Sequence, residues 1–338
     1  MNLKNSMLTV FIGSILVFGQ ASAANYSNVY VFGDSLSDAG GAPWAVESIY
    51  KLLGNNCDPF HPCPPYAGGR YTNGPVAAEY AAYFLSSSGA NAGGFYDFAV
   101  GGSTTGIGNV GDGGSVGTPG LLSLPGIALQ IQLYLSIAGQ ADANGLYILQ
   151  GGANDMFAAI SSGAFAPAAA ITAADNIAAY ATLLAATGAE HIMVSNLVDL
   201  SLTPEARAYG SVVDAQIQQL SILYNTELAA RLADLNVLFP SLHLIDFDHF
   251  ALSESVLANP GAYGLTNVTD ACLVNSVVCS DPSAYAFWDS LHPTTALNAY
   301  TGAAMMAAAV PLPPSAWLFA FGVAGIFCSR KARQAIEA

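Results

Sequence analysis

Two short blocks near opposite ends of the chain hold a serine, an aspartate and a histidine. Gly33-Asp34-Ser35-Leu36 follows a run of β-branched and aromatic residues, and Asp289-Ser290-Leu291-His292 comes much later. A glycine after a buried strand can turn the chain tightly and lift the next side chains to the carboxyl edge of a sheet, where ligands bind in open α/β folds. A serine there becomes a nucleophile when a histidine, held by a carboxylate, takes its proton. The sequence therefore indicates Ser35 as nucleophile, His292 as base and Asp289 as the carboxylate.

The spacing around His292 favours this role. Asp289 and His292 stand three residues apart, so one helical turn would bring the carboxylate to the imidazole. Pro293 has a φ suited to a first helical turn and residues 294–309 have a helical pattern, so we expect His292 at a helix start. A histidine that merely caps this helix is the simpler alternative. His249 is the rival for the base.

Acyl transfer also needs hydrogen-bond donors aimed at a developing oxyanion, and two glycine-containing strand ends can supply them. The strand-like run 97–102 (DFAVGG) ends in two glycines, whose backbone N–H groups can approach a substrate closely. The run 146–155 (LYILQGGAND) ends in Gly152-Ala153-Asn154-Asp155, which places the amide of Asn154 at the same sheet edge. Each could be an ordinary turn, but four such features at strand ends together indicate a hydrolase site.

In order, these four blocks resemble the conserved blocks of the GDSL or SGNH hydrolases. The resemblance covers about residues 28–309, and three further stretches, starting at Gly69, Ser195 and Phe287, are similar to the lipase, phospholipase and hemolysin-like branch. It implies a flavodoxin-like, three-layer α/β/α fold with a central parallel sheet of about five strands.

The resemblance also assigns roles to residues. It implies Ser35 as nucleophile and His292 as base, oriented by Asp289. It implies an oxyanion hole formed by the N–H of Ser35, the N–H of Gly102 and the side-chain amide of Asn154. Gly102 is our choice over Gly101 as the donor.

Apolar strand-like runs alternate with helical patterns, which predicts a parallel sheet covered on both faces in one domain, residues 24–309. The expected strands are residues 28–32, 95–100, 146–149, 191–196 and 242–246. The expected helices are residues 76–85, 127–137, 172–186, 212–235 and 294–309. Three long inserts, 51–73, 101–125 and 253–283, are rich in Gly, Pro, Asn and Ser, and we expect them to surround the site.

One segment fits a dinucleotide-binding pattern. Gly106-Ile107-Gly108-Asn109-Val110-Gly111 has the G-x-G-x-x-G spacing, but its continuation GDGGSVGTPG cannot form a helix whose N-terminus holds a pyrophosphate. We therefore expect no nucleotide, and no other cofactor or metal for the chemistry.

Residues 1–23 have the pattern of a secretory signal peptide. Lys4 precedes the apolar run 7–18, and Ala21-Ser22-Ala23 offers a small-residue cleavage site before Ala24. The apolar core is too short for a spanning helix. The sequence therefore predicts export.

Export favours disulfides, and the cysteines fall into local pairs. The expected pairs are Cys57 with Cys63 and Cys272 with Cys279. Zinc binding is a weaker alternative, because neither pair has CxxC spacing and the two distant pairs would have to converge.

Residues 310–338 carry a second targeting pattern. The segment VPLPP precedes an apolar run, 315–328, that is marginal for spanning a bilayer. Three basic residues follow: Arg330, Lys331 and Arg333. This tail resembles the PEP-CTERM sorting signals of Gram-negative bacteria, which an exosortase processes, although Leu312 stands where glutamate is usual. We expect a transient inner-membrane anchor and release to the cell surface or matrix, with permanent anchoring in the periplasm as the alternative.

Without both ends the chain keeps four basic and 22 acidic side chains, a net charge near −18. Such a surface argues against nucleic acid as a partner and against tight docking on anionic bilayers.

The sequence thus predicts a secreted serine esterase or lipase that hydrolyses acyl esters through an acyl-enzyme on Ser35, with lipid esters as leading substrates. Exopolysaccharide O-deacetylation and lipid acyl transfer on the same site are the enzymatic alternatives. A catalytically idle matrix or adhesion protein is the non-enzymatic one, and the presence of all four blocks speaks against it.

Overall fold

The computed structural model describes residues 25–310 except 42, 91–92 and 164. Residues 24–310 belong to one compact unit. The predicted signal peptide and sorting signal lie outside the described residues.

Five parallel strands form the central sheet, as the alternating sequence pattern predicted. They are β1 (Val29–Phe32), β2 (Phe95–Asp97), β3 (Leu146–Leu149), β4 (His191–Ser195) and β5 (His243–Phe247). Their order in the sheet is β2-β1-β3-β4-β5. Phe32, the last residue of β1, pairs with Leu149, the last residue of β3, so the segments after these two strands leave the sheet side by side.

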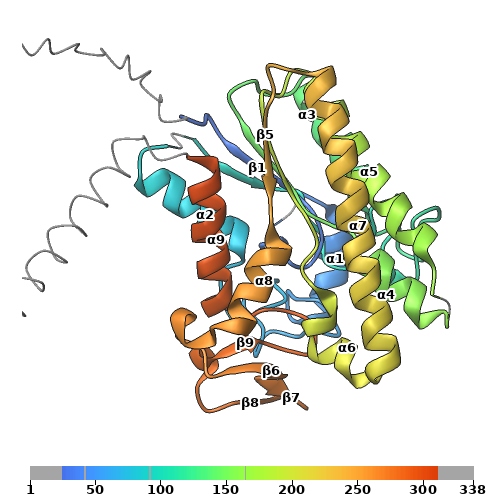
Figure 1. Ribbon diagram of the computed structural model, residues 1–338, viewed down its shortest axis with the longest axis vertical. Helices are drawn as coiled ribbons and strands as arrows, with labels where there is room; N and C mark the ends of the chain where they lie inside the picture. The colour runs from blue at the N-terminus through green and yellow to red at the C-terminus, as the bar shows by residue number, and fades with distance from the viewer. Residues whose placement is uncertain (1–24, 42, 91–92, 164, 311–338) are drawn as a thin grey trace, which may run out of the picture. The chain divides into compact units, whose positions relative to one another are not determined.

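Helices cover both faces of this sheet, which confirms the expected three-layer fold (Figure 1). On one face lie α3 (Ile127–Ala138), α5 (Pro167–Ala186) and α7 (Ser211–Leu238), packed on alternate residues such as Phe32 and Leu149. On the other face lie α2 (Ala77–Ser87) and α9 (Thr295–Ala309), packed on Val31 and Ile148. The alternation along each strand is what a sheet buried on both sides requires.

Helix α5 is the one helix among the described residues that is long and apolar enough to cross a membrane by length and composition. Its face formed by Ala170, Ile177 and Leu184 is buried in the core, beside α7. It is therefore a core helix of this domain.

Shorter elements gather around the carboxyl ends of the strands (Figure 1). The helices are α1 (Ala45–Lys51), α4 (Ala153–Ser161), α6 (Pro204–Ala208) and α8 (His249–Ala258), with the 3₁₀ turns η1 (Leu52–Gly54), η2 (Val110–Asp112), η3 (Leu200–Leu202), η4 (Pro260–Tyr263) and η5 (Pro282–Ala284). The strands β6 (Asn267–Ala271) and β9 (Tyr285–Phe287) pair in parallel, and β7 (Leu273–Val274) with β8 (Val277–Val278) form an antiparallel pair.

Several boundaries differ from the sequence prediction. Strand β2 ends at Asp97 rather than at residue 100, because the Asp97 carboxylate accepts the N–H groups of Ala39 and Ala99 and turns the chain. Helix α5 begins five residues earlier than expected, with Pro167 in its first turn, where a proline has no hydrogen bond to lose. Helices α1, α4, α6 and α8 were not predicted.

Both expected cysteine pairs are disulfides, Cys57–Cys63 and Cys272–Cys279. The first closes a loop in the insert 51–73 and the second joins the segments of β7 and β8.

Candidate active site

Ser35 lies in the turn that follows β1. Gly33 begins the turn, and both of its backbone groups bond to the buried side chain of Gln130, N–H to Oε1 over 2.9 Å and C=O to Nε2 over 2.8 Å. A Cβ at residue 33 would stand 2.8 Å from the carbonyl oxygen of Gln150, so the position needs glycine. The turn closes as Ser37 and Asp38 donate to the Asp34 carbonyl. Ser35 is thereby held, nearly buried, at the carboxyl edge of the sheet.

The structure brings Ser35, His292 and Asp289 into hydrogen-bonding contact. Nε2 of His292 is 2.8 Å from Oγ of Ser35, and Nδ1 is 2.8 Å from Oδ2 and 3.0 Å from Oδ1 of Asp289. All three side chains are buried. This is the chain of contacts by which a carboxylate orients a histidine and the histidine takes a proton from serine.

Charges in the site tune these groups. Burial alone would lower the pKa of His292, but the charge and hydrogen bond of Asp289, with smaller contributions from Asp34 and Asp58, raise it above its ordinary value. Burial alone would raise the pKa of Asp289, but the charge of His292 and the hydrogen bonds it receives hold that pKa well below its usual range. Asp289 therefore stays ionised beside a histidine that accepts protons readily.

The prediction that His292 lies at a helix start was wrong. Helix α9 begins at Thr295 with Thr294 as its N-cap, and Pro293 pairs with Phe287 in an isolated bridge instead of opening the helix. The Asp289 carboxylate itself closes the turn, because Oδ1 accepts the N–H of Leu291 over 2.8 Å and that of His292 over 2.7 Å. Such a side-chain-closed turn brings the two residues together without a helix.

Three candidate oxyanion donors lie at this edge of the sheet. The N–H groups of Ser35 and Gly102 have no hydrogen-bond acceptor within the described part of the chain. Gly101 differs, because its N–H donates to Oδ2 of Asp38 over 2.9 Å, which leaves Gly102 as the available glycine. Asn154 stands in the first turn of α4 and uses one amide hydrogen on the Ser103 carbonyl, 2.9 Å away, so its second hydrogen is available.

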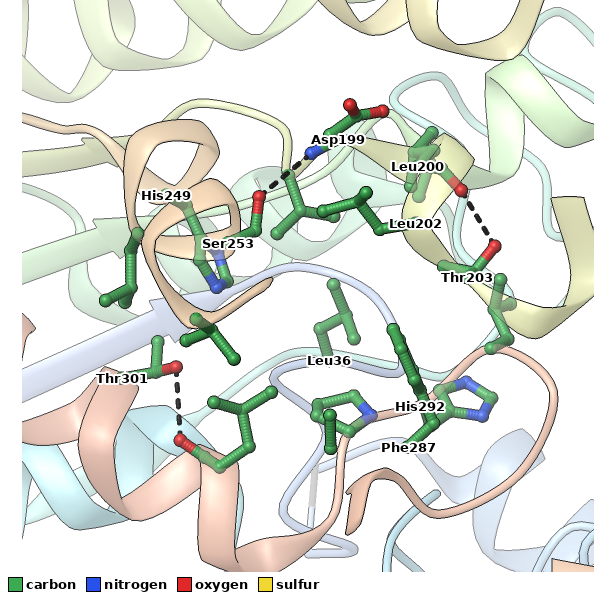
Figure 2. Close-up of a pocket in the computed structure, with 18 of the residues that line it drawn as sticks. Leu36, Asp199, Leu200, Leu202, Thr203, His249, Ser253, Phe287, His292 and Thr301 are labelled. Atoms are coloured by element: carbon green, nitrogen blue, oxygen red, sulfur yellow. Dashed lines mark hydrogen bonds between the residues drawn. The ribbon is translucent and has the colours of Figure 1, made fainter. Parts of the chain in front are cut away.

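An apolar pocket opens beside Ser35, Asn154 and His292 (Figure 2). Its cavity volume is about 90 Å³. The walls come from the turn after β1, the loop after β4, α8, β9 and α9. They include Leu36, Leu200, Leu202, Leu252, Val256, Phe287 and Leu297.

His249, the rival for the base, is a wall residue of this pocket at the start of α8. Burial lowers its pKa to about 4, so the imidazole is neutral at ordinary pH. Its Nδ1 is 3.4 Å from Nε2 of Gln150, whereas His292 is the histidine that contacts Ser35.

The insert 51–73 contributes aromatic and acidic groups that the sequence did not single out. Tyr66 donates to Asp289, and the rings of His61 and Tyr71 pack against His292 with centroids 5.7 and 5.3 Å away. His61 is itself held by Asp58, Nδ1 to Oδ1 over 3.0 Å. The sequence predicted that this insert surrounds the site, but the role of each side chain depends on contacts across the fold.

Within the described residues, His61, Asp289 and His292 form one group whose possible metal-ligating atoms lie within 4.8 Å of one another. Asp289 and His292 bond to each other, and His61 bonds to Asp58. These contacts fit the positioning of a catalytic base.

The sequence profile of GDSL-like lipases and acylhydrolases matches residues 29–305. The chain belongs to this family. A GDSL esterase/lipase of Arabidopsis thaliana is 31% identical over 104 residues, which are 30% of each chain, so this match spans well under two thirds of that relative. A second GDSL esterase/lipase of the same plant is 25% identical over 345 residues, covering 88% of this chain and 95% of the relative.

Solved structures of lipases and esterases align with most of this chain at low sequence identity. An acetylxylan esterase from Geobacillus stearothermophilus aligns with a TM-score of 0.44 and 12% sequence identity, over 85% of this chain and 93% of that one. Membership of the GDSL family supports ester hydrolysis as the general chemistry. The narrower assignment to the lipase, phospholipase and hemolysin-like branch stays a prediction.

Proposed function

We propose that this chain is a serine esterase or lipase that cleaves carboxylic acyl esters through an acyl-enzyme on Ser35. The observation that carries the proposal is the 2.8 Å contact between Ser35 Oγ and His292 Nε2. The other ring nitrogen of His292, Nδ1, is hydrogen-bonded to Asp289. Family membership supports the reaction class.

The proposed reaction has two half-steps. His292 takes the Ser35 proton as Oγ attacks the ester carbonyl carbon, and the carbonyl oxygen becomes an oxyanion held by the N–H groups of Ser35 and Gly102 and by Asn154. The imidazolium returns the proton to the departing alcohol. Water, deprotonated by His292, then attacks the acyl carbon. The bond from this carbon to Ser35 Oγ breaks, the imidazolium returns the proton to Oγ, and the acid is released.

The pocket supports acyl chains longer than acetyl. A bound water needs roughly 10–15 Å³ on the same volume measure, so the cavity of about 90 Å³ has room for several water-sized groups in a row. Its walls of leucine, valine and phenylalanine would bury the methylene groups of an acyl chain. Each buried methylene group contributes about 0.8 kcal/mol to the binding free energy. Lipid acyl esters are therefore our leading substrate class, ahead of an acetylated polysaccharide.

A chain-length series tests this proposal. Purified protein is assayed on p-nitrophenyl acetate, butyrate, octanoate and palmitate, beside a lysophospholipid and an acetylated glycan. We expect kcat/KM to rise from acetate to a chain of several carbons. A preference for acetate or for the glycan would contradict the acyl-lipid assignment and favour deacetylation.

The nucleophile is tested with matched serine variants. Ser35→Ala should abolish turnover and labelling by a fluorophosphonate probe, because only the activated hydroxyl is acylated or phosphonylated. Ser290→Ala is the control, since Ser290 is exposed and stands between Asp289 and His292 in the same block. Labelling that persists in Ser35→Ala would overturn the assignment.

We also propose that the protein acts outside the cytoplasm. Two disulfides support this location, because such bonds persist in oxidising compartments. The signal-like residues 1–23 and the sorting-like tail point the same way.

A further inference from the structure

The glycine-rich segment 106–111, which has dinucleotide-binding spacing, folds back onto the oxyanion segment instead. Val110 N–H donates to the Gly102 carbonyl over 2.8 Å, and Ser103 bridges to Asn109. A Cβ at Gly106 would stand 1.8 Å from the carbonyl oxygen of Val116. The glycines thus permit backbone packing at this turn.

Asn109 is the polar side chain at the centre of this contact. It is fully buried, and its Nδ2 donates to the Gly101 carbonyl over 2.8 Å and to the Pro125 carbonyl over 3.3 Å. Its Oδ1 accepts the N–H of Gly111 over 2.8 Å. Because both the nitrogen and the oxygen of the Asn109 amide are hydrogen-bonded to the backbone, these bonds fix the orientation of the side chain.

The carbonyl that Asn109 holds belongs to the same peptide as the Gly102 N–H. A trans peptide is planar, with its C=O and N–H pointing in opposite directions, so fixing the Gly101 oxygen also fixes the direction of the Gly102 hydrogen. Gly102 has φ of +80°, and a Cβ there would stand 2.4 Å from Oδ1 of Asn109, so only glycine fits this close approach.

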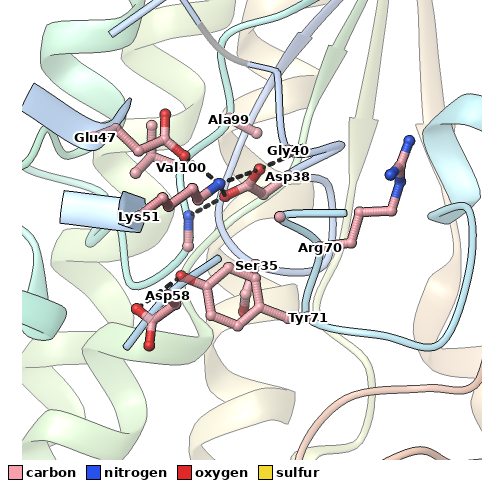
Figure 3. A network of polar contacts seen from close by, with 12 residues as sticks. Ser35, Asp38, Gly40, Glu47, Lys51, Asp58, Arg70, Tyr71, Ala99 and Val100 are labelled. Carbon is pink, nitrogen blue, oxygen red and sulfur yellow. Dashed lines mark hydrogen bonds and ion pairs between the residues drawn. The ribbon is translucent and has the colours of Figure 1, made fainter. Parts of the chain in front are cut away.

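A second anchor holds the other side of the same segment. Gly101 N–H donates to Oδ2 of Asp38, and Lys51 Nζ bonds both carboxylate oxygens of Asp38 over 3.0 and 3.1 Å (Figure 3). Lys51 also pairs with Glu47. Burial would lower the pKa of Lys51, but these two carboxylates raise it, so the lysine stays charged.

The two anchors leave one group free. The Gly101 N–H, the Gly101 carbonyl and the Gly102 carbonyl are all bonded, and the Gly102 N–H alone has no acceptor within the described residues. We propose that Asn109 is a positioning residue of the oxyanion hole, holding the Gly101–Gly102 peptide so that its N–H is presented to the substrate carbonyl. This rests on the proposed esterase function.

The test compares Asn109→Ala with Asn28→Ala. Asn28 makes the same kind of bond, accepting the Gly94 N–H over 2.9 Å, but it precedes β1 at the opposite edge of the sheet from Ser35. For each variant we would measure kcat, KM, the inhibition constant of an alkyl boronic acid that forms a tetrahedral adduct on serine, and the melting temperature.

We expect Asn109→Ala to lose about 10- to 100-fold in kcat, as for a misplaced catalytic group, with KM changed by less than about threefold. The inhibition constant of the boronic acid should rise by a similar factor, because its tetrahedral adduct uses the same hydrogen-bond donors. Asn28→Ala should keep wild-type kcat. A kcat for Asn109→Ala within about threefold of wild type, or an equal kcat loss in Asn28→Ala, overturns the proposal.

Asn109→Asp supplies a second, independent measurement if Asn109→Ala does not fold. A protonated carboxyl can still donate to the Gly101 oxygen, whereas an ionised one repels it. Because position 109 is fully buried, the pKa of the new carboxyl should be raised, so the ratio of variant to wild-type kcat should fall as pH rises from 4 to 9. A constant ratio over this range overturns the proposal. Absence of wild-type turnover on any ester is a different result, since it contradicts the proposed function itself.

Discussion

The phenol of Tyr66 donates a hydrogen bond to Oδ2 of Asp289 over 2.7 Å, the same oxygen that lies 2.8 Å from Nδ1 of His292. Tyr66 follows the Cys57–Cys63 disulfide, and its ring packs edge-on against Trp288, the residue before Asp289. The disulfide loop is thus tied directly to the group that orients the candidate base.

Tyr66→Phe should shift the pH dependence of turnover upward. The phenol draws negative charge from Asp289, so its loss leaves a carboxylate that stabilises the imidazolium of His292 more strongly and raises the His292 pKa further. Because the base must be neutral, the acidic limb of kcat/KM against pH should move to higher pH. Tyr83→Phe, on the exposed face of α2, is the control. An unchanged limb would make Tyr66 a packing residue.

The hydrophobic pattern was sufficient to predict the sheet. Leu146–Leu149 has the predicted bounds, and the other four strands were placed within three residues, because buried parallel strands are short apolar runs. Helix α4 was missed, since Gly152 and Asn154 are typical of a turn and only the packing of Met156 and Ile160 shows the helix.

The site residues likewise fall into those that the sequence predicted and those that it could not predict. The sequence blocks led to Ser35, Asp289 and His292, which the structure brings into contact, because each follows a strand or lies in a short self-closing turn. Tyr66 and Asn109 could not be predicted, because their roles arise from contacts between inserts that have no periodic pattern.

Asn154→Ala should lower kcat by on the order of 10² to 10³ with little change in KM, as when one oxyanion donor is removed. The reason is that the second amide hydrogen acts only when charge develops on the substrate oxygen. Steady-state kinetics on one ester checks this, with Asn28→Ala as the control for loss of a side-chain to backbone bond. A kcat equal to wild type would return Asn154 to a structural role.

Replacement of the two candidate histidines should give opposite results. His292→Ala should lose nearly all turnover, because no other side chain is hydrogen-bonded to Ser35 Oγ within the described residues. His249→Gln should keep kcat on a short ester and change only the preference among long acyl chains, since His249 lines the pocket. Turnover that survives in His292→Ala and disappears in His249→Gln would identify His249, not His292, as the catalytic base.

The ends of the chain lead to a prediction about processing. If residues 1–23 are a signal peptide and the tail is a sorting signal, as we propose, protein recovered from its native host should begin near Ala24 and lack the apolar run 315–328. Intact-mass measurement decides this. A form that retains Trp317 to Ala338 would mean permanent anchoring.

Asp34→Asn should stabilise the protein at high pH. Asp34 is almost fully buried, its Oδ1 accepts the Leu36 N–H over 3.1 Å, and its Oδ2 has no hydrogen-bond partner among the described residues. Burial raises its pKa from 3.8 to about 6. The folded state therefore binds the proton more tightly than the unfolded state, so wild-type stability falls as pH rises from about 4 to 6, and the cost persists above pH 6.

Asparagine keeps the acceptor for Leu36 and cannot ionise, so Asp34→Asn should gain on the order of 1 to 3 kcal/mol at pH 8 and about nothing below pH 4. Urea unfolding at several pH values measures this, with Asp270→Asn, an exposed site, as control. The substitution should also change the pH dependence of turnover, since the Asp34 charge helps to raise the His292 pKa and its removal should move the acidic limb of kcat/KM to lower pH. A stability difference that does not change between pH 4 and 8 would show that Asp34 does not change its charge on folding in this range.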